Sequence, residues 1–178
     1  MGLERLLQVC ESTLLSLSII DCGTLLTDKS IWLASCYSRM LRSVEYLSSS
    51  FPLGPDVMYA LGAGCRDITT LKIHPIYPCE NEEKFSNKCL QIVSQFCSDL
   101  EVLSIGGSKV DINGLVLIES CKHLKDVQVS LFISDFYQGK AEKEDTKLKK
   151  WQKFVKDIKS LERIPGLGNI LKLSLQNT

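Results

Sequence analysis

The sequence has no surplus of charge of either sign and no long hydrophobic run. Its 178 residues hold 21 lysines and arginines against 21 aspartates and glutamates, so the formal net charge at pH 7 is zero. A balanced chain exerts no overall attraction on nucleic acid or on an anionic membrane, although a local patch still can. No apolar stretch approaches the roughly 20 residues of a membrane-spanning helix. We therefore predict neither a nucleic-acid nor a membrane partner.

The sequence also lacks targeting and glycosylation signals. The first ten residues include Glu4 and Arg5 and do not have the layout of a secretory signal. Gly2 follows Met1, but Leu6 stands where myristoylation requires serine or threonine. No Asn-x-Ser/Thr sequon occurs. These absences predict a soluble, unanchored domain in the cytoplasm or nucleus.

Residue patterns that carry chemistry are scarce. No CxxC pair is present, and the gaps between His74, Cys79 and Cys89 match no common zinc pattern. His123 lies at a predicted helix-to-strand turn, and nothing brings a cysteine or serine nucleophile within reach of a histidine. The glycine-containing segment 105–109 lacks the spacing of a phosphate-binding loop. We therefore predict no metal, no cofactor and no enzymatic activity.

The chain has the apolar content of an ordinary packed domain and, in addition, many cysteines. Apolar residues make up 44% of the sequence, with 11 glycines and 5 prolines, which suits one packed domain. Eight cysteines form either a disulfide framework or a set of reduced, buried thiols. A chain this rich in leucine, isoleucine and valine needs no covalent staples, so we favour reduced thiols.

Five cysteines recur in one context, at intervals of 26, 29, 32 and 24 residues. Each follows an apolar residue by four positions, which places both on one face of a helix. We expect these five to be buried and unpaired, and a thiol reagent to reach at most Cys22, Cys79 and Cys89. The recurring cysteines are Cys10, Cys36, Cys65, Cys97 and Cys121.

An apolar-x-x-apolar-x-apolar pattern follows each of these cysteines three to five residues later. Its last three residues alternate as a strand with one buried face does. A sixth copy closes the chain. The pattern predicts strands at about 14–19, 41–46, 68–73, 100–105, 124–129 and 170–175. Each period is then one strand and one helix, and consecutive units must stack to bury their apolar sides.

The best unit runs from Leu14 through Cys22 and Leu26-Thr27-Asp28 to Cys36. It resembles the cysteine-containing leucine-rich repeats of F-box proteins. The shared features are the strand, the cysteine that follows it, the start of the helix and the cysteine that ends the helix. The resemblance implies an α/β fold, a right-handed leucine-rich-repeat solenoid. Its parallel strands would line a concave face and its helices a convex face.

We expect a single domain over residues 1–178, with loop insertions at about 48–56, 74–87 and 130–146. Both ends look cut from a longer array. Apolar residues at helical spacing from Leu148 to Leu161 predict an amphipathic helix. Residues 140–163 hold nine Lys/Arg and five Asp/Glu. The polar face of this helix is therefore either an ordinary solvated surface or a basic docking patch.

The candidate binding residues are the strand positions that point away from the helices. They are small or mixed in charge, with no aromatic row and no basic stripe, which suits a protein ligand. The alternative is that they are only solvated. These candidates are Ser16, Ser18, Ser43, Glu45, Thr70, Lys72, Val102, Ser104, Asp126, Gln128, Lys172 and Ser174.

The resemblance implies a non-enzymatic protein-protein interaction module, the substrate-recognition repeats of an F-box-type subunit of an SCF ubiquitin ligase. Its partner would be a protein ligand, a ubiquitination substrate, and a Skp-type adaptor would bind only through an F-box absent from this chain. The alternatives are a scaffold or assembly factor unrelated to ubiquitin, a regulator acting through the basic helix at 147–159, and a thiol- or metal-dependent enzyme.

Overall fold

The computed structural model describes residues 2–11, 13–22, 28–48, 53–75, 85–106, 110–132, 149, 152–153, 155–156, 159 and 166–176. Most of the three expected insertions and most of the expected amphipathic helix lie outside these residues. The described positions of that helix, which include Lys149, Lys153, Lys156 and Lys159, are helical, and these four lysines are exposed. No helix among the described residues is long and apolar enough to cross a bilayer.

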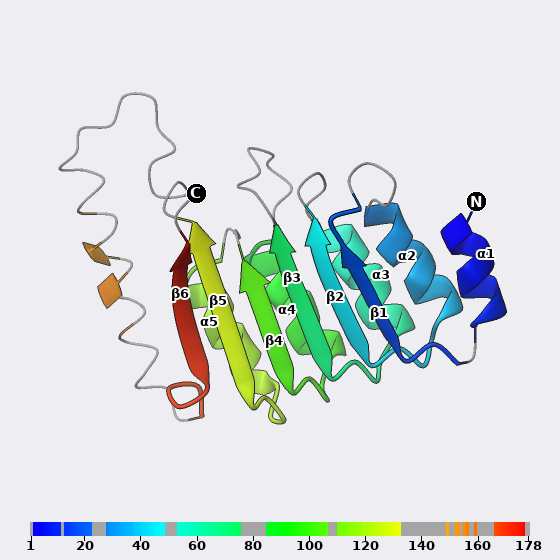
Figure 1. Cartoon of the computed structure of the whole chain (residues 1–178). Helices are drawn as coiled ribbons and strands as arrows, with labels where there is room; N and C mark the ends of the chain where they lie inside the picture. Colours follow the sequence, from blue (N-terminus) through cyan, green and yellow to red (C-terminus); the bar gives the residue numbers. More distant parts are fainter. Residues whose placement is uncertain are drawn as a thin grey trace.

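Six strands form a single sheet, ordered along the chain from β1 to β6 (Figure 1). Every neighbouring pair is parallel. The strands are β1 (Ser16–Ile20), β2 (Ser43–Ser48), β3 (Thr70–Pro75), β4 (Val102–Gly106), β5 (Asp126–Phe132) and β6 (Leu171–Gln176). The predicted α/β class and the six parallel strands are confirmed.

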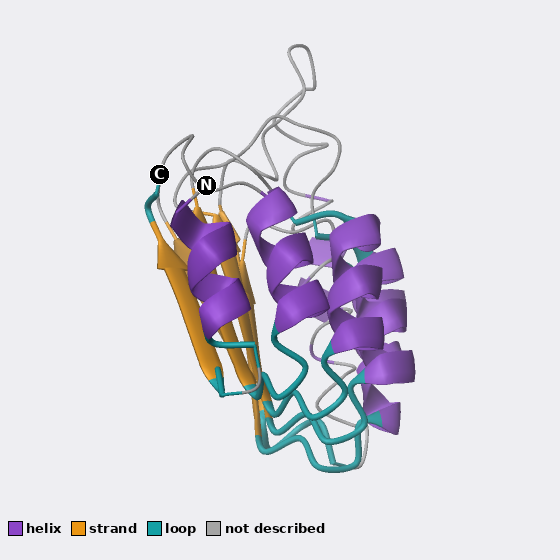
Figure 2. Cartoon of the chain, turned by 90° about the vertical axis from the view of Figure 1, so that its right-hand side faces the viewer, coloured by secondary structure: helices purple, strands orange, loops and turns teal. Residues whose placement is uncertain are grey.

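The helices form a second layer over one face of the sheet, and the strands form the other layer (Figure 2). Among the helices whose full extent the structure describes, five α-helices alternate with strands β1 to β5, and a short 3-10 helix follows the fifth. Their bounds are α1 (Gly2–Val9), α2 (Asp28–Tyr37), α3 (Pro55–Gly64), α4 (Asn87–Phe96), α5 (Ile112–Leu117) and η1 (Ile118–Ser120). The sheet therefore has one covered face and one face free of described helices.

A proline and an aspartate mark the starts of two helices, α3 and α5. Proline stands at the start of α3, where its missing N–H costs no hydrogen bond. Asp111 caps α5, because its carboxylate accepts from the amides of Asn113 at 2.8 Å and Gly114 at 3.3 Å. Burial alone would raise the pKa of Asp111, but these bonds and one from Asn87 Nδ2 outweigh it and lower that pKa.

A hydrogen-bond motif recurs where successive strands begin. The Leu15 carbonyl accepts from the amides of Arg42 and Ser43, at 2.8 and 3.1 Å. The Arg42 carbonyl accepts in the same way from Thr69 and Thr70, at 2.9 and 3.0 Å. The carbonyls of Thr69 and Glu101 continue the series. The units that contain β2, β3, β4 and β5 are thus each aligned on the one before by the same two bonds.

The core lies between the two layers and is built from the inward positions of the strands. The sheet register aligns Val44, Leu71, Leu103 and Val127, all fully buried. The strands begin about two residues later than predicted. The leading apolar residue of each pattern instead precedes the strand: Leu41, Ile68 and Leu100 are fully buried there, whereas Leu14, Leu124 and Ile170 are half-buried.

The expectation of five buried cysteines is wrong for Cys36 and holds only in part for Cys10. Cys65, Cys97 and Cys121 are buried and unpaired, whereas Cys10 is half-buried and Cys36 is exposed. The fully buried Ser38 occupies the position that Cys65 and Cys97 hold in their units. Its carbonyl accepts from Leu41, three residues on, as that of Cys97 does from Leu100. The distance to the next strand therefore sets which residue faces the core.

Two expectations for the second insertion also need correction. Cys89, just after this insertion, was among the three cysteines that a reagent was expected to reach at most, and it is fully buried in α4. His74 was expected in a loop, but it belongs to β3, which continues to Pro75. Cys22 is half-buried, and Cys79 lies outside the described residues. Leu53, inside the first expected insertion, is buried, and β5 continues to Phe132, inside the third.

Candidate protein-binding face

The sheet face opposite the helices, here called the open face, carries the predicted binding residues in rows across the strands. The parallel register sets three such rows. The first holds Ser16, Ser43, Thr70, Val102 and Asp126. The middle row holds Ser18, Glu45, Lys72, Ser104, Gln128 and Lys172. The third row holds Ile20, Leu47, His74, Gly106, Ser130 and Ser174. All twelve predicted residues thus lie on the open face.

Charged side chains on the open face are paired with one another. Lys72 Nζ lies 3.9 Å from Glu45 Oε1, and Lys172 Nζ lies 3.0 Å from Asp126 Oδ1. Ser18 Oγ donates to Glu45 Oε2 at 3.1 Å. The hydrogen bond from Lys172 lowers the pKa of Asp126, and Gln128 adds to this effect. The open face therefore presents alternating, locally neutralised charges to a partner.

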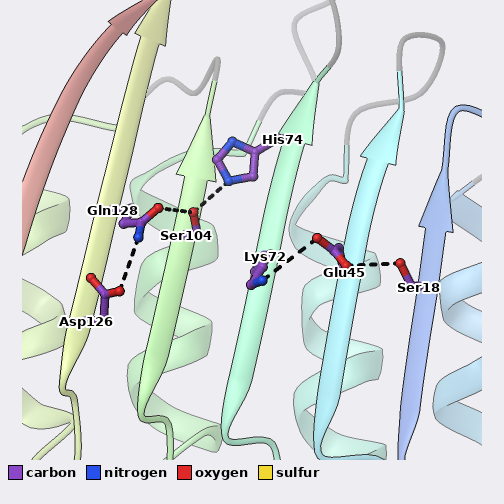
Figure 3. A network of polar contacts seen from close by, with 7 residues as sticks. All are labelled: Ser18, Glu45, Lys72, His74, Ser104, Asp126 and Gln128. Atoms are coloured by element: carbon purple, nitrogen blue, oxygen red, sulfur yellow. Dashed lines mark hydrogen bonds and ion pairs between the residues drawn. The ribbon is translucent and has the colours of Figure 1, made fainter.

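A second set of contacts links β3, β4 and β5 (Figure 3). His74 Nε2 lies 2.7 Å from Ser104 Oγ, which donates to Gln128 Oε1 at 3.4 Å. Gln128 Nε2 then donates to Asp126 Oδ2 at 3.1 Å. We call these four residues the His74 relay. It fixes the orientation of each side chain, so this part of the face is preorganised for binding.

His74 is the functional candidate that the sequence interpretation missed. Burial lowers its pKa, Glu45 opposes this shift and Lys72 adds to it. The missing signal was simple, because His74 continues the alternation of Thr70 and Lys72 by one more step. Ser130 continues the alternation of β5 in the same way, and its Oγ lies 2.7 Å from Ser174 Oγ. In both strands the predicted range ended too early.

The predicted residues differ in how accessible they are. Ser16 and Ser18 are exposed, whereas Ser104 is only 5% exposed because the side chains around it cover its hydroxyl. Val102 is half-buried. The open face is thus freely accessible over β1 and filled by interacting side chains over β4.

The arrangement does bring a serine and a histidine together, contrary to expectation. Ser104 Oγ and His74 Nε2 are within hydrogen-bond distance. The hydroxyl is nearly covered, however, and its proton is directed toward Gln128. It is therefore oriented away from the histidine that would have to act as its base. Ser104 serves as a link in the relay and is not arranged for nucleophilic attack.

The buried thiols are also unsuited to nucleophilic chemistry. Burial raises the pKa of Cys65 to about 11 and that of Cys97 to about 12. These thiols stay protonated at neutral pH, and the thiolate is the reactive form. Over the described ranges, no three His, Cys, Asp or Glu residues come close enough together to hold a metal ion.

The fold and the open face define an α/β protein with a single parallel sheet, helices on one face and a polar, charge-paired surface on the other. No protein-family model matches the sequence. The chain is similar to F-box only protein 41 of Mus musculus and of Homo sapiens, with 30% identity to each over an alignment 228 positions long. The alignments cover 98% of this chain and 26% of each relative, so the chain spans about a quarter of their length.

Proposed function

We propose that the chain is a non-enzymatic protein-binding module, a leucine-rich-repeat solenoid that serves as the substrate-recognition part of an F-box-type ubiquitin-ligase subunit. The observation that carries the proposal is the open face, with its preorganised polar side chains. The similarity to F-box only protein 41 supports the link to F-box proteins. The seven described cysteines are all unpaired, which supports a cytoplasmic or nuclear location, where thiols stay reduced.

The chemistry of the open face favours an extended protein segment over other ligands. Its paired charges leave no stripe of one sign for a polyanion. A polar surface with fixed hydrogen-bonding groups selects a partner by complementarity more than by buried area. The open face would accordingly hold a substrate, and a Skp-type adaptor would contact an F-box elsewhere in the full-length protein.

The decisive experiment changes the pattern of charges on the open face without removing the pairing. In Glu45→Lys/Lys72→Glu, each pair partner takes the other's charge, so an ion pair is still available and the fold is retained. Proteins captured from lysate by the wild-type chain should be lost or bind about tenfold more weakly. The matched control is Glu119→Lys/Lys122→Glu, which exchanges two exposed charges on the helix side. Equal losses with both variants would overturn the assignment of the face.

The link to ubiquitin is tested with the full-length protein. Co-purified material should contain ubiquitin-ligase subunits, and the captured substrate should become ubiquitinated in a manner that depends on Glu45 and Lys72. Stable partners with no ligase subunits would indicate a scaffold instead. If capture survives the charge exchange but is lost when residues 140–150 are deleted, the binding site lies in that segment and the open face does not form it.

A further inference from the structure

The donor and acceptor roles in the His74 relay can be assigned in order, starting from the carboxylate of Asp126. An ionised carboxylate can only accept hydrogen bonds, so Gln128 must turn its amide nitrogen toward Asp126. Its amide oxygen then faces Ser104 and accepts the hydroxyl proton. Ser104 Oγ has spent its single proton and is left as an acceptor toward His74. With the Ser104 proton on the bond to Gln128, His74 Nε2 acts as the donor across the 2.7 Å contact, which corresponds to the Nε2-protonated tautomer.

The other ring nitrogen is then an unprotonated acceptor. Among the described residues, no hydrogen bond is made to His74 Nδ1. Gly106 on β4 lies beside it, and a Cβ at that position would come within 2.6 Å of Nδ1. Gly106 therefore leaves the room in which the ring sits next to Ser104. The neutral ring is also favoured by its surroundings, because burial lowers the pKa of His74.

We propose that His74 is a specificity-determining residue of the open face, whose Nδ1 accepts a hydrogen bond from an N–H group of the bound protein segment. The inference rests on the proposed function, since it names what that face recognises. An acceptor held in place by three further side chains is preorganised, so a partner with a correctly placed N–H donor gains affinity and one that offers only acceptors is rejected. The charged groups that act on the ring are Glu45 and Lys72, and Asp126 is linked to it only through Gln128 and Ser104.

The tautomer can be measured without any partner. The chain has only two histidines, His74 and His123. Nitrogen-15 NMR of the imidazole rings in the His123→Gln variant therefore reports on His74 alone. At neutral pH we expect Nε2 to carry the proton and Nδ1 to show the shift of an unprotonated nitrogen. Ser104→Ala should release the ring into a mixture of tautomers. Protonation at Nδ1 in the wild-type relay would overturn the proposal.

Two substitutions then separate recognition from structure. In His74→Gln, the longer amide reaches toward Ser104 as Nε2 does but leaves no acceptor at the place of Nδ1. His74→Asn keeps an acceptor near that place and gives up the bond to Ser104. Capture of the partner isolated with the wild-type chain should weaken about tenfold in the glutamine variant, the fold-change of one lost hydrogen bond. The asparagine variant should weaken less.

The steric role of Gly106 gives an independent check. Gly106→Ala should push the ring away from Ser104 and change the nitrogen-15 shifts, whereas Gly2→Ala, where no atom lies within 4 Å of the added Cβ, should change nothing. Unchanged capture in His74→Gln would overturn the recognition role. If the wild-type chain captures no partner, the proposed function fails, while the measured tautomer still decides whether Nδ1 is an acceptor.

Discussion

The middle of the molecule and its two ends follow the same sequence pattern, but the apolar side chains of the pattern are buried to different extents. Leu71 and Leu103 are fully buried, whereas Leu17, at the same register position on β1, is half-buried. Ile105 is fully buried on β4, but Leu173, at the corresponding position on β6, is 41% exposed. Near β1, Leu6 and Val9 of α1 are 55% and 84% exposed. Residue type alone therefore does not determine burial.

The difference follows from stacking. A unit in the middle is covered by a neighbour on each side, and a unit at an edge of the sheet by one described neighbour only. Apolar surface contributes to stability in proportion to the area removed from water. The same leucine therefore stabilises the middle of the sheet more than its edge, and this expectation can be tested with matched substitutions.

The largest contrast is expected in thiol reactivity. Cys36 is exposed, whereas Cys97 is 2% exposed and burial raises its pKa to about 12. Cys97 reacts only when the structure opens, so we expect it to be modified slower than Cys36 by about a thousandfold or more. A mass-spectrometric time course with a thiol reagent in native buffer measures both rates. Cys36→Ser should remove the fast labelling of the peptide that contains residue 36, and comparable rates at Cys36 and Cys97 would contradict the packing described above.

The cysteine pattern also shows how far the sequence could be interpreted. It located six strands and their parallel order, because alternation and period are properties of the sequence itself. It misassigned Cys36, because the spacing from cysteine to strand was allowed to vary between three and five residues. The buried turn residue Leu41 requires the core position three residues earlier, and Ser38 occupies it. A fixed spacing to the strand would have identified Ser38.

The next contrast concerns unfolding free energy. Leu103→Ala removes a fully buried side chain and leaves a cavity between two neighbours, which costs about 3 kcal/mol. Leu17→Ala removes the same atoms from the half-buried position on β1 and should cost only about 1 kcal/mol. Urea unfolding followed by circular dichroism measures both. Equal losses would mean that the edge of the sheet is as well packed as the middle.

The sequence predicted which residues lie on the open face but not which of their side chains contact one another. Alternation places Ser104, Asp126 and Gln128 on one face, and the parallel sheet aligns them in rows. That Gln128 contacts both Ser104 and Asp126 depends on side-chain rotamers, which the sequence does not specify. His74 was missed because it was assigned to the following loop. One further step of alternation places it in β3.

A smaller effect is expected where α2 and α3 approach closely. A Cβ on Gly64 would overlap the main-chain carbonyl oxygen of Ser35 and lie 3.1 Å from its carbonyl carbon. Main chain cannot move aside as a side chain can, so Gly64→Ala should cost about 2 kcal/mol through overpacking. Gly2→Ala, with no atom within 4 Å of the added Cβ, should be neutral or slightly stabilising. Thermal unfolding of both variants compares them, and a stabilised Gly64→Ala would show that the helices separate freely.

The smallest effect is expected at the edge formed by β6. Lys172 pairs with Asp126 across β5 and β6, and this contact lowers the pKa of Asp126. A carboxyl whose pKa is lower in the folded than in the unfolded state stabilises the fold above its unfolded pKa. That contribution is lost as pH falls through its folded pKa. Lys172→Met should therefore cost less than about 1 kcal/mol near neutral pH, because the pair is partly exposed, and the cost should vanish in acid.

The control for this change is Lys125→Met, which removes a more exposed pair with Glu101, at 2.8 Å and with both side chains well solvated. Its effect should be close to zero at every pH, since exposed pairs are weakened by solvent and by salt. Urea midpoints measured at several pH values distinguish the two variants. A loss of stability in Lys172→Met that does not change with pH would mean that Lys172 acts through the packing of its aliphatic stem on the edge strand. The ion pair with Asp126 would then contribute nothing to holding β6 against β5.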